Sequence, residues 1–249
     1  MTRYFLELAY KGTHYSGFQS QQNANSIQAE VEKALAIIRR EKIILTGSSR
    51  TDAGVHAHQN FFHFDTLDAI STWKAVETED NLIYKMNAIL PDDIVIKAIY
   101  PVAPEAHCRF DALSREYKYH IYNKKDAFKR ERAFFFPYKL DVEKMQQAAS
   151  IVKEYHDFTS FSKRNTQVKT FMCQIIQSKW LIEEEMLVYN VIANRFLRGM
   201  VRALTATMLQ VGRNKISLDQ FRAIIEAKDC TKASFAVPPH GLFLVEVKY

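Results

Sequence analysis

The order of hydrophobic patterns along the chain predicts an α+β fold made of two halves. Segments that alternate apolar and polar residues, as strands do, stand between segments with helical spacing. The order strand–helix–strand–strand–helix–strand occurs first in residues 3–103 and again, with one extra helix, in residues 114–248. This order is that of a split βαβ unit, so we expect two ferredoxin-like (βαββαβ) halves with mixed, mostly antiparallel sheets.

The first half is expected to hold four strands and two helices. Residues 3–10 alternate as a strand, and a helical stripe follows from Ile27 to Ile38. Asn25 and Gln28 stand three residues apart just before that stripe, which predicts a capping box. The remaining expected elements are strands at 42–46, 58–65 and 94–103 and a helix around 82–89, which Pro91 follows.

The second half repeats the order with one additional short helix. We place the boundary between 105 and 106, giving domains 1–105 and 106–249, because periodicity breaks near Pro104. Ser217 and Gln220 predict a capping box for the short helix, and Gly212 is expected to end the long helix before it. The expected elements are strands at 114–123, 171–182, 186–194 and 242–248 and helices starting near Asp141, Leu197 and Ser217, with a hairpin turn at 183–185.

Composition narrows the class of protein. Of the 249 residues, 47% are hydrophobic and 25% are charged, which excludes disordered and collagen-like chains. A net charge of +6 suits a polyanionic partner and equally suits a basic enzyme with no such partner. Three widely separated cysteines indicate no disulfide framework, and no stretch is apolar enough for a signal peptide or a membrane span. We therefore expect a cytoplasmic protein with no membrane partner.

The stretch from Gly47 to Ala57 has the residue types of a functional loop. It lies between two expected strands and carries Asp52, Arg50, several hydroxyl groups and two glycines. Glycines let a backbone approach a ligand closely, and an arginine beside an aspartate keeps the carboxylate ionised. From these residues alone, a tight turn with a local salt bridge explains the pattern as well as a catalytic site does.

The run Arg50-Thr51-Asp52-Ala53-Gly54-Val55-His56-Ala57 closely resembles the signature of the TruA family of tRNA pseudouridine synthases. The resemblance extends along nearly the whole chain, in the order that the family has, although the family commonly has Trp where this chain has Phe18. The other matching segments are Tyr10–Gln19, Leu90–Ile96, Arg115–Tyr119, His156–Phe161, Phe196–Arg202 and Gly241–Leu244.

This resemblance implies a specific activity and assembly. TruA-like enzymes isomerise uridine to pseudouridine at positions 38, 39 and 40 in the anticodon arm of tRNA. The resemblance implies a homodimer whose two ferredoxin-like halves flank a basic catalytic cleft, with tRNA as partner and no metal or organic cofactor. A base inside a paired stem must be extruded before such chemistry.

The resemblance also implies roles for individual residues. Asp52 corresponds to the essential catalytic carboxylate, and Arg50 to the residue that holds it and fills the space of the extruded base. Tyr117 corresponds to the tyrosine that packs on the target base, and Arg202 to an arginine that pairs with the carboxylate. Leu242 and Leu244 are either pocket wall or ordinary strand core.

Two basic stretches are candidates for tRNA phosphate contacts. We expect Lys124, Lys125, Lys129 and Arg130 to contribute in the first. In the second, which spans residues 162–169, Lys163 and Arg164 are the candidates. A solvated charged surface is the simpler explanation of each stretch taken alone.

Two rival functions remain at this point. His56, His58 and His63 lie close in sequence to Asp52, which leaves open a metal-dependent hydrolase, although their spacing matches no strong metal motif. The second rival is a non-catalytic RNA-binding module, because ferredoxin-like halves share their outline with RNA-recognition domains. Removal of metal by a chelator would inactivate a metal-dependent hydrolase. The substitution Asp52→Ala would leave the function of an RNA-binding module unchanged.

Overall fold

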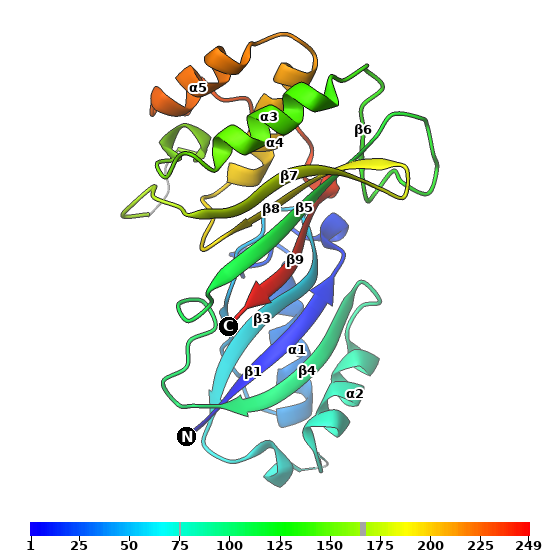
Figure 1. Ribbon diagram of the computed structural model, residues 1–249. Helices are drawn as coiled ribbons and strands as arrows, with labels where there is room; N and C mark the ends of the chain where they lie inside the picture. The colour runs from blue at the N-terminus through cyan, green and yellow to red at the C-terminus, as the bar shows by residue number, and fades with distance from the viewer. Residues whose placement is uncertain (75, 165–167) are drawn as a thin grey trace. The chain divides into compact units, whose positions relative to one another are not determined.

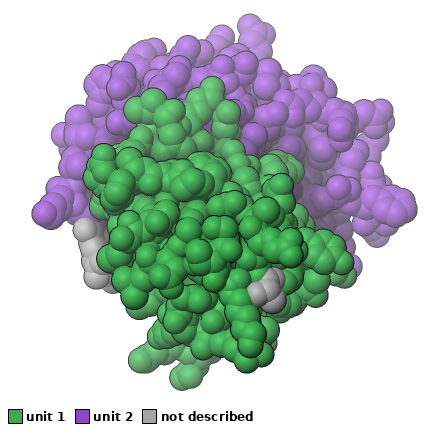
Figure 2. All heavy atoms as spheres, turned by 90° about the horizontal axis from the view of Figure 1, so that it is seen from below, with its two compact units in different colours: residues 1–113, 246–249 green, residues 114–245 purple. Residues whose placement is uncertain are grey.

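The computed structural model describes residues 1–74, 76–164 and 168–249, and it confirms the α+β class (Figure 1). The described residues form five α-helices and nine strands, and most strand pairs are antiparallel. The chain divides into two compact units, unit 1 with residues 1–113 and 246–249 and unit 2 with residues 114–245 (Figure 2). No helix in these ranges is both long and apolar enough to cross a membrane.

Unit 1 is built around the first strand. Strand β1 pairs antiparallel with β3 on one side and with β4 on the other, and the short β2 pairs with β3. Helices α1 and α2 cover one face of this sheet (Figure 1). The elements are β1 (Thr2–Tyr10), α1 (Ile27–Arg39), β2 (Thr46–Gly47), β3 (His56–Thr66), α2 (Glu79–Ile89) and β4 (Ile94–Val102), with short 3-10 helices η1 (Gly12–His14) and η2 (Ile70–Thr72).

Both faces of β3 in unit 1 carry buried aromatic rings. Phe62 and Phe64 are buried on one face, and Phe64 stacks on Tyr4 with ring centroids 5.7 Å apart. Phe61 is buried on the other face, where its ring meets Tyr249 edge to face with centroids 5.1 Å apart. The C-terminal tyrosine therefore covers part of the sheet face that the helices leave open.

Unit 2 repeats the combination of antiparallel strands and helices. Strand β8 pairs antiparallel with β5 and β7, and the short β6 pairs parallel with β5. Helices α3 and α4 pack against each other and supply much of the core. The elements are β5 (Ser114–Tyr122), β6 (Phe134–Phe135), α3 (Val142–Val152), η3 (Thr159–Phe161), β7 (Ile175–Glu183), β8 (Met186–Ala193), α4 (Met200–Gly212), α5 (Leu218–Glu226), η4 (Pro239–Gly241) and β9 (Leu242–Lys248), of which the residues from Glu246 onward belong to unit 1.

Several local predictions are confirmed. Asp141 caps α3 by accepting from the Lys144 N–H, and Ser217 with Gln220 forms the predicted capping box of α5. The hairpin turns where predicted, between Glu183 and Met186, with positive φ at both central residues. Two positive φ values are the pattern of a type I′ turn, whose twist matches that of the flanking strands.

Other local predictions are wrong by a few residues. The cap of α1 is Ser26, not Asn25, because the Ser26 hydroxyl accepts from the Ala29 N–H at 3.2 Å. The expected strand at 42–46 pairs only from Thr46, although Ile43 and Leu45 are buried. The expected strand at 171–182 begins at Ile175.

Gly212 ends α4, but not through its conformation. The left-handed residue after this helix is Asn214, at φ 56°. A Cβ atom at Gly212 would collide with the Met145 side chain of α3. Glycine is needed here because the two helices pack closely, and not because the backbone turns left-handed.

Candidate active site

The loop between β2 and β3 places Asp52 at the start of a tight turn. The Val55 N–H donates to the Asp52 carbonyl at 3.2 Å, and Gly54 lies between them with φ 76°. A positive φ at the third residue of a turn suits glycine. Asp52 is half-buried and Arg50 is exposed, so both residues keep some surface that solvent can reach.

The end of β1 and the segment that follows it hold this loop. The Tyr10 hydroxyl lies 2.8 Å from the Thr51 hydroxyl, and the Phe18 N–H donates to the Thr51 carbonyl at 3.1 Å. On the other side of Asp52, the Gly12 N–H donates to Nδ1 of the buried His56 at 3.0 Å. The backbone is thus fixed immediately before Asp52 and shortly after it.

Two glycines allow the approach of the two segments. A Cβ atom at Gly12 would collide with the Val55 carbonyl oxygen. Gly17 has φ 116°, and a Cβ there would lie 3.1 Å from the Thr51 carbonyl oxygen. At Gly12 the loop backbone occupies the space of a side chain, and at Gly17 the positive φ disfavours any residue but glycine.

Phe18 anchors the same segment through its ring. The ring is 1% exposed and stacks on Phe62 with centroids 4.5 Å apart and planes 10° apart. On its other side lies Tyr10, at 5.6 Å between centroids. An apolar stack of this kind uses the area of the ring and needs no indole donor, so phenylalanine meets the requirement.

Asn60 is a residue of this site that sequence reasoning missed. Its side chain is fully buried, and it donates to the Ser49 carbonyl at 2.9 Å and to the Tyr10 hydroxyl at 3.2 Å. Its amide oxygen accepts from the Ser49 N–H at 3.3 Å and from the Phe61 N–H at 2.9 Å. The sequence signal that could have identified Asn60 is its place as a polar residue within the apolar run of β3. A buried amide must be hydrogen-bonded, so such a residue is expected to hold neighbouring segments.

In unit 2, Arg202 and Tyr119 hold the segment that leads into β9. Arg202 donates from Nε and Nη2 to the Val237 carbonyl, at 3.1 and 2.7 Å. The Tyr119 hydroxyl donates to the next carbonyl, that of Pro238, at 2.7 Å. Burial raises the pKa of Tyr119, and the positive charge of Arg202 opposes that rise. The hydroxyl therefore stays protonated and remains a donor.

The other predicted pocket residues of unit 2 lie on β5 and β9. The Tyr117 ring is buried and meets Phe196 edge to face, with centroids 5.1 Å apart and planes 85° apart. Leu242 is 7% exposed and Leu244 is fully buried. Leu244 thus contributes to the strand core of unit 2, whereas Leu242 keeps a small exposed surface.

The candidate phosphate contacts differ in their surroundings. Lys124, Lys125 and Arg130 are exposed, whereas Lys129 lies 3.5 Å from Asp126. Asp126 also accepts from the Phe128 N–H, and this hydrogen bond, then Lys129, lowers its pKa. Lys129 is therefore partly neutralised within its own loop.

The second basic stretch is described in part. The aliphatic part of the Lys163 side chain packs against Gly199, and the backbone N–H of Lys163 donates to the Arg198 carbonyl at 3.0 Å. Arg164 is exposed, with Nε 3.4 Å from Cys230 Sγ. Residues 165–167 of this stretch lie outside the described residues.

The histidine grouping considered from sequence does not form. His56 is engaged with Gly12, and His58 is exposed. His63 lies instead beside His107 and Cys108, which is the one group of three or more potential metal ligands found in the described ranges. A hydrolytic metal centre built from His56, His58 and His63 is therefore not supported.

Comparison with known proteins gives the class to which this loop and fold belong. A family described as tRNA pseudouridine synthase matches residues 8–111 and 155–249. The chain belongs to this family, which confirms the resemblance inferred from its sequence.

Curated relatives define the branch of the family. The three described next all carry the name tRNA pseudouridine synthase A. The protein of Parabacteroides distasonis is 46% identical over 100% of this chain and 96% of its own. The proteins of Porphyromonas gingivalis and Bacillus subtilis are 44% and 37% identical, over 100% and 97% of this chain and 98% and 97% of their own.

Proposed function

We propose that this protein is an isomerase that converts uridine to pseudouridine in tRNA, at positions 38, 39 and 40 of the anticodon arm. The observation that carries the proposal is the half-buried Asp52, which sits at a turn held on both sides within the signature of the family. The reaction breaks the N1–C1′ bond of uridine, forms a C5–C1′ bond, releases the C5 proton and adds a proton to N1. It conserves every other atom, so it calls for no redox or group-carrying cofactor.

Asp52 is the proposed catalytic carboxylate. Arg50 lies exposed two residues before it, which suits a side chain that enters the space of an extruded base. The guanidinium is always charged and also favours the ionised form of a nearby carboxylate.

Tyr117 and Arg202 are the proposed contributions of unit 2. Stacking of a base on an aromatic ring is worth about 1–3 kcal/mol, enough to stabilise an extruded uridine on Tyr117. Phe196 fixes the plane of that ring from one edge. Val237 fixes the guanidinium of Arg202, so its charge is oriented before substrate arrives.

The remaining features of the proposal rest on the family. They are two ferredoxin-like halves around a basic cleft, a homodimer and a cytoplasmic location. Phosphate contacts through Lys124, Lys125, Lys129, Arg130, Lys163 and Arg164 would position tRNA without reading its bases. Leu242, with its small exposed surface, is the proposed apolar wall of the pocket.

Tritium release tests the activity and the residue together. Unmodified tRNA with tritium at uridine C5 is incubated with the wild-type protein, with Asp52→Asn and with Asp80→Asn. Asp80 is an exposed carboxylate in the first turn of α2 and serves as the matched control. Wild type and Asp80→Asn should release tritium to water, and Asp52→Asn should bind tRNA but release none.

Two results would overturn the proposal. Absence of release by the wild-type protein from a complete pool of unmodified tRNA would leave an RNA-binding module as the better description. Release by Asp52→Asn at the wild-type rate would remove Asp52 from the chemistry. Mapping of the product positions then tests the assignment to positions 38, 39 and 40.

A further inference from the structure

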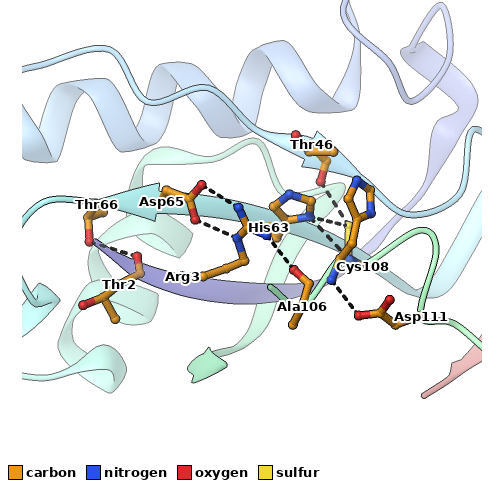
Figure 3. Close-up of polar contacts among 10 residues, drawn as sticks. Thr2, Arg3, Thr46, His63, Asp65, Thr66, Ala106, Cys108 and Asp111 are labelled. Atoms are coloured by element: carbon orange, nitrogen blue, oxygen red, sulfur yellow. Dashed lines mark hydrogen bonds and ion pairs between the residues drawn. The ribbon is translucent and has the colours of Figure 1, made fainter. Parts of the chain in front are cut away.

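A cluster of potential metal ligands lies in unit 1, apart from the turn that carries Asp52. His63 of β3 points toward Cys108, and its Nδ1 lies 3.1 Å from the Cys108 Sγ (Figure 3). His107 packs edge to face on His63, with ring centroids 4.6 Å apart. One ligand atom from each of the three residues lies within 4.8 Å of the other two. We propose that His63, His107 and Cys108 form a site for a thiophilic divalent cation, with Zn²⁺ as the expected ion.

The donor set is the one that zinc prefers. Thiolate sulfur and imidazole nitrogen are its commonest protein ligands, and three protein ligands leave a fourth tetrahedral position for water. His63 is 6% exposed, and burial, followed by the nearby His107, lowers its pKa to about 4. The imidazole is therefore neutral at physiological pH, which is the form that binds a metal.

Binding of the cation would release one proton, from the Cys108 thiol. Cys108 Sγ now donates to the Thr46 carbonyl at 3.2 Å, so the sulfur carries a proton. On binding, that proton passes to solvent, and a sulfur–metal bond replaces the hydrogen bond to Thr46. Affinity should consequently fall as pH falls, because protons compete with the cation for the ligands.

The backbone around the two adjacent ligands is held before any cation arrives. The His107 N–H donates to the Asp111 carboxylate at 2.7 Å, and Arg3 Nη1 donates to the Ala106 carbonyl at 2.9 Å. The Tyr249 hydroxyl donates to the Cys108 carbonyl at 2.6 Å. Ligands whose supports are already in place lose less freedom on binding.

A surface hollow on the β2 side is lined by one of the three proposed ligands. The hollow, of about 420 Å³, is lined by Thr46 and His63, together with Ile43, Ile44 and Thr66. His63 and Thr46 each contact Cys108, so an ion that enters the hollow meets the first ligand directly. The site would tie β3 to the segment that follows β4.

The test uses the full-length protein freed of metal, with Co²⁺ and Zn²⁺ as probes. Co²⁺ bound to a thiolate gives a sulfur-to-metal charge-transfer band in the near ultraviolet and ligand-field bands in the visible range. We expect one equivalent of Co²⁺ to produce both, and one equivalent of Zn²⁺ to abolish them and raise the melting temperature by several degrees.

Three variants locate the ion. Cys108→Ser should lose the charge-transfer band, and His107→Ala should weaken binding at least tenfold. His58→Ala is the matched control, because this exposed histidine of β3 lies outside the cluster, and it should bind as the wild type does. His107 is less buried than Cys108, so His107→Ala decides the question if Cys108→Ser does not fold.

Failure to bind one equivalent of either ion overturns the proposal. Unchanged binding in both His107→Ala and Cys108→Ser overturns it as well, since the cation would then lie elsewhere. Neither measurement depends on isomerase activity, so the result stands apart from the proposed function.

Discussion

The hydroxyl groups of Tyr10 and Thr51 lie 2.8 Å apart, so the last residue of β1 supports the residue immediately before Asp52. Asn60 donates to the same tyrosine hydroxyl at 3.2 Å and also binds Ser49. A single buried hydroxyl thus connects β1, β3 and the loop between β2 and β3. We therefore expect the position of the proposed catalytic carboxylate to depend on this connection.

Replacement of Tyr10 by phenylalanine tests that connection. The ring stack on Phe18 should persist, while Thr51 and Asn60 each lose one partner. Loss of a partner by a buried polar group costs about 1–3 kcal/mol, so the free energy of unfolding of unit 1 should fall by that amount. Turnover should fall further than tRNA affinity does, because the loop moves but the phosphate contacts remain. Equal changes in turnover and affinity would contradict a positioning role.

Replacement of Gly12 by alanine tests the close approach of the two segments. The new Cβ collides with the Val55 carbonyl, so the loop or η1 must move. Overpacking of this kind costs about 1–3 kcal/mol, and we expect reduced turnover together with a lower urea midpoint. The neighbouring Thr13→Ala is the control. Its hydroxyl is buried with no hydrogen-bond partner in the described part of the chain, so Thr13→Ala should cost much less stability than Gly12→Ala.

The local parts of the fold could be predicted because their signals lie within a few residues. The caps of α3 and α5 and the hairpin after Glu183 depend on neighbouring side chains and turn geometry. The error in the predicted cap of α1 also has a local cause. Asn25 and Ser26 are both good capping residues, and the Gln28 amide oxygen, which a capping box needs as acceptor, accepts instead from the Ser20 N–H at 3.1 Å.

The supports of the candidate site could not be predicted in the same way. Tyr119 and Pro238 are 119 residues apart, and Tyr10 and Asn60 are 50 apart. A single sequence gives no signal that such distant residues are in contact, since each tyrosine also fits the pattern of an ordinary strand residue. The residue types of the loop around Asp52 marked it as a possible site, and only the resemblance of its signature favoured a catalytic site over a tight turn with a local salt bridge.

Acid should destabilise unit 2 through His240. Burial lowers the pKa of this imidazole below its ordinary value of 6.5, while a backbone hydrogen bond with Ala133 acts in the opposite direction. Below pH 6.5 the unfolded chain binds a proton that the folded chain resists. The stability that His240 contributes is therefore complete above pH 6.5 and is lost as pH falls toward the folded pKa.

The fluorescence of Trp180 reports this effect. Trp180 lies in unit 2, and the only other tryptophan, Trp73, lies in unit 1 and is replaced by phenylalanine for the measurement. Between pH 7.5 and pH 5.5, the urea midpoint should fall more with His240 than with His240→Gln. If the urea midpoints of the two proteins fell equally between these pH values, His240 would have the same pKa in the folded and unfolded chains.

The charge of the loop after β5 should govern the salt dependence of tRNA binding. Lys124, Lys125 and Arg130 are exposed, whereas Lys129 is paired with Asp126. Each phosphate contact changes the slope of log K against log salt concentration by about 0.7–0.9. Replacement of the three exposed residues by alanine should therefore reduce that slope by about 2–3, and Lys129→Ala alone should reduce it by less than one such contact.

A control with the same change in net charge separates location from total charge. Lys33, Lys42 and Lys74 are exposed on unit 1, and their replacement also removes three positive charges. Long-range attraction depends on net charge and would weaken equally in both triple variants. Direct phosphate contacts depend on position, so only the variant at 124, 125 and 130 should flatten the slope. Equal slopes in the two variants would remove this loop from the tRNA interface and leave its lysines as a solvated surface.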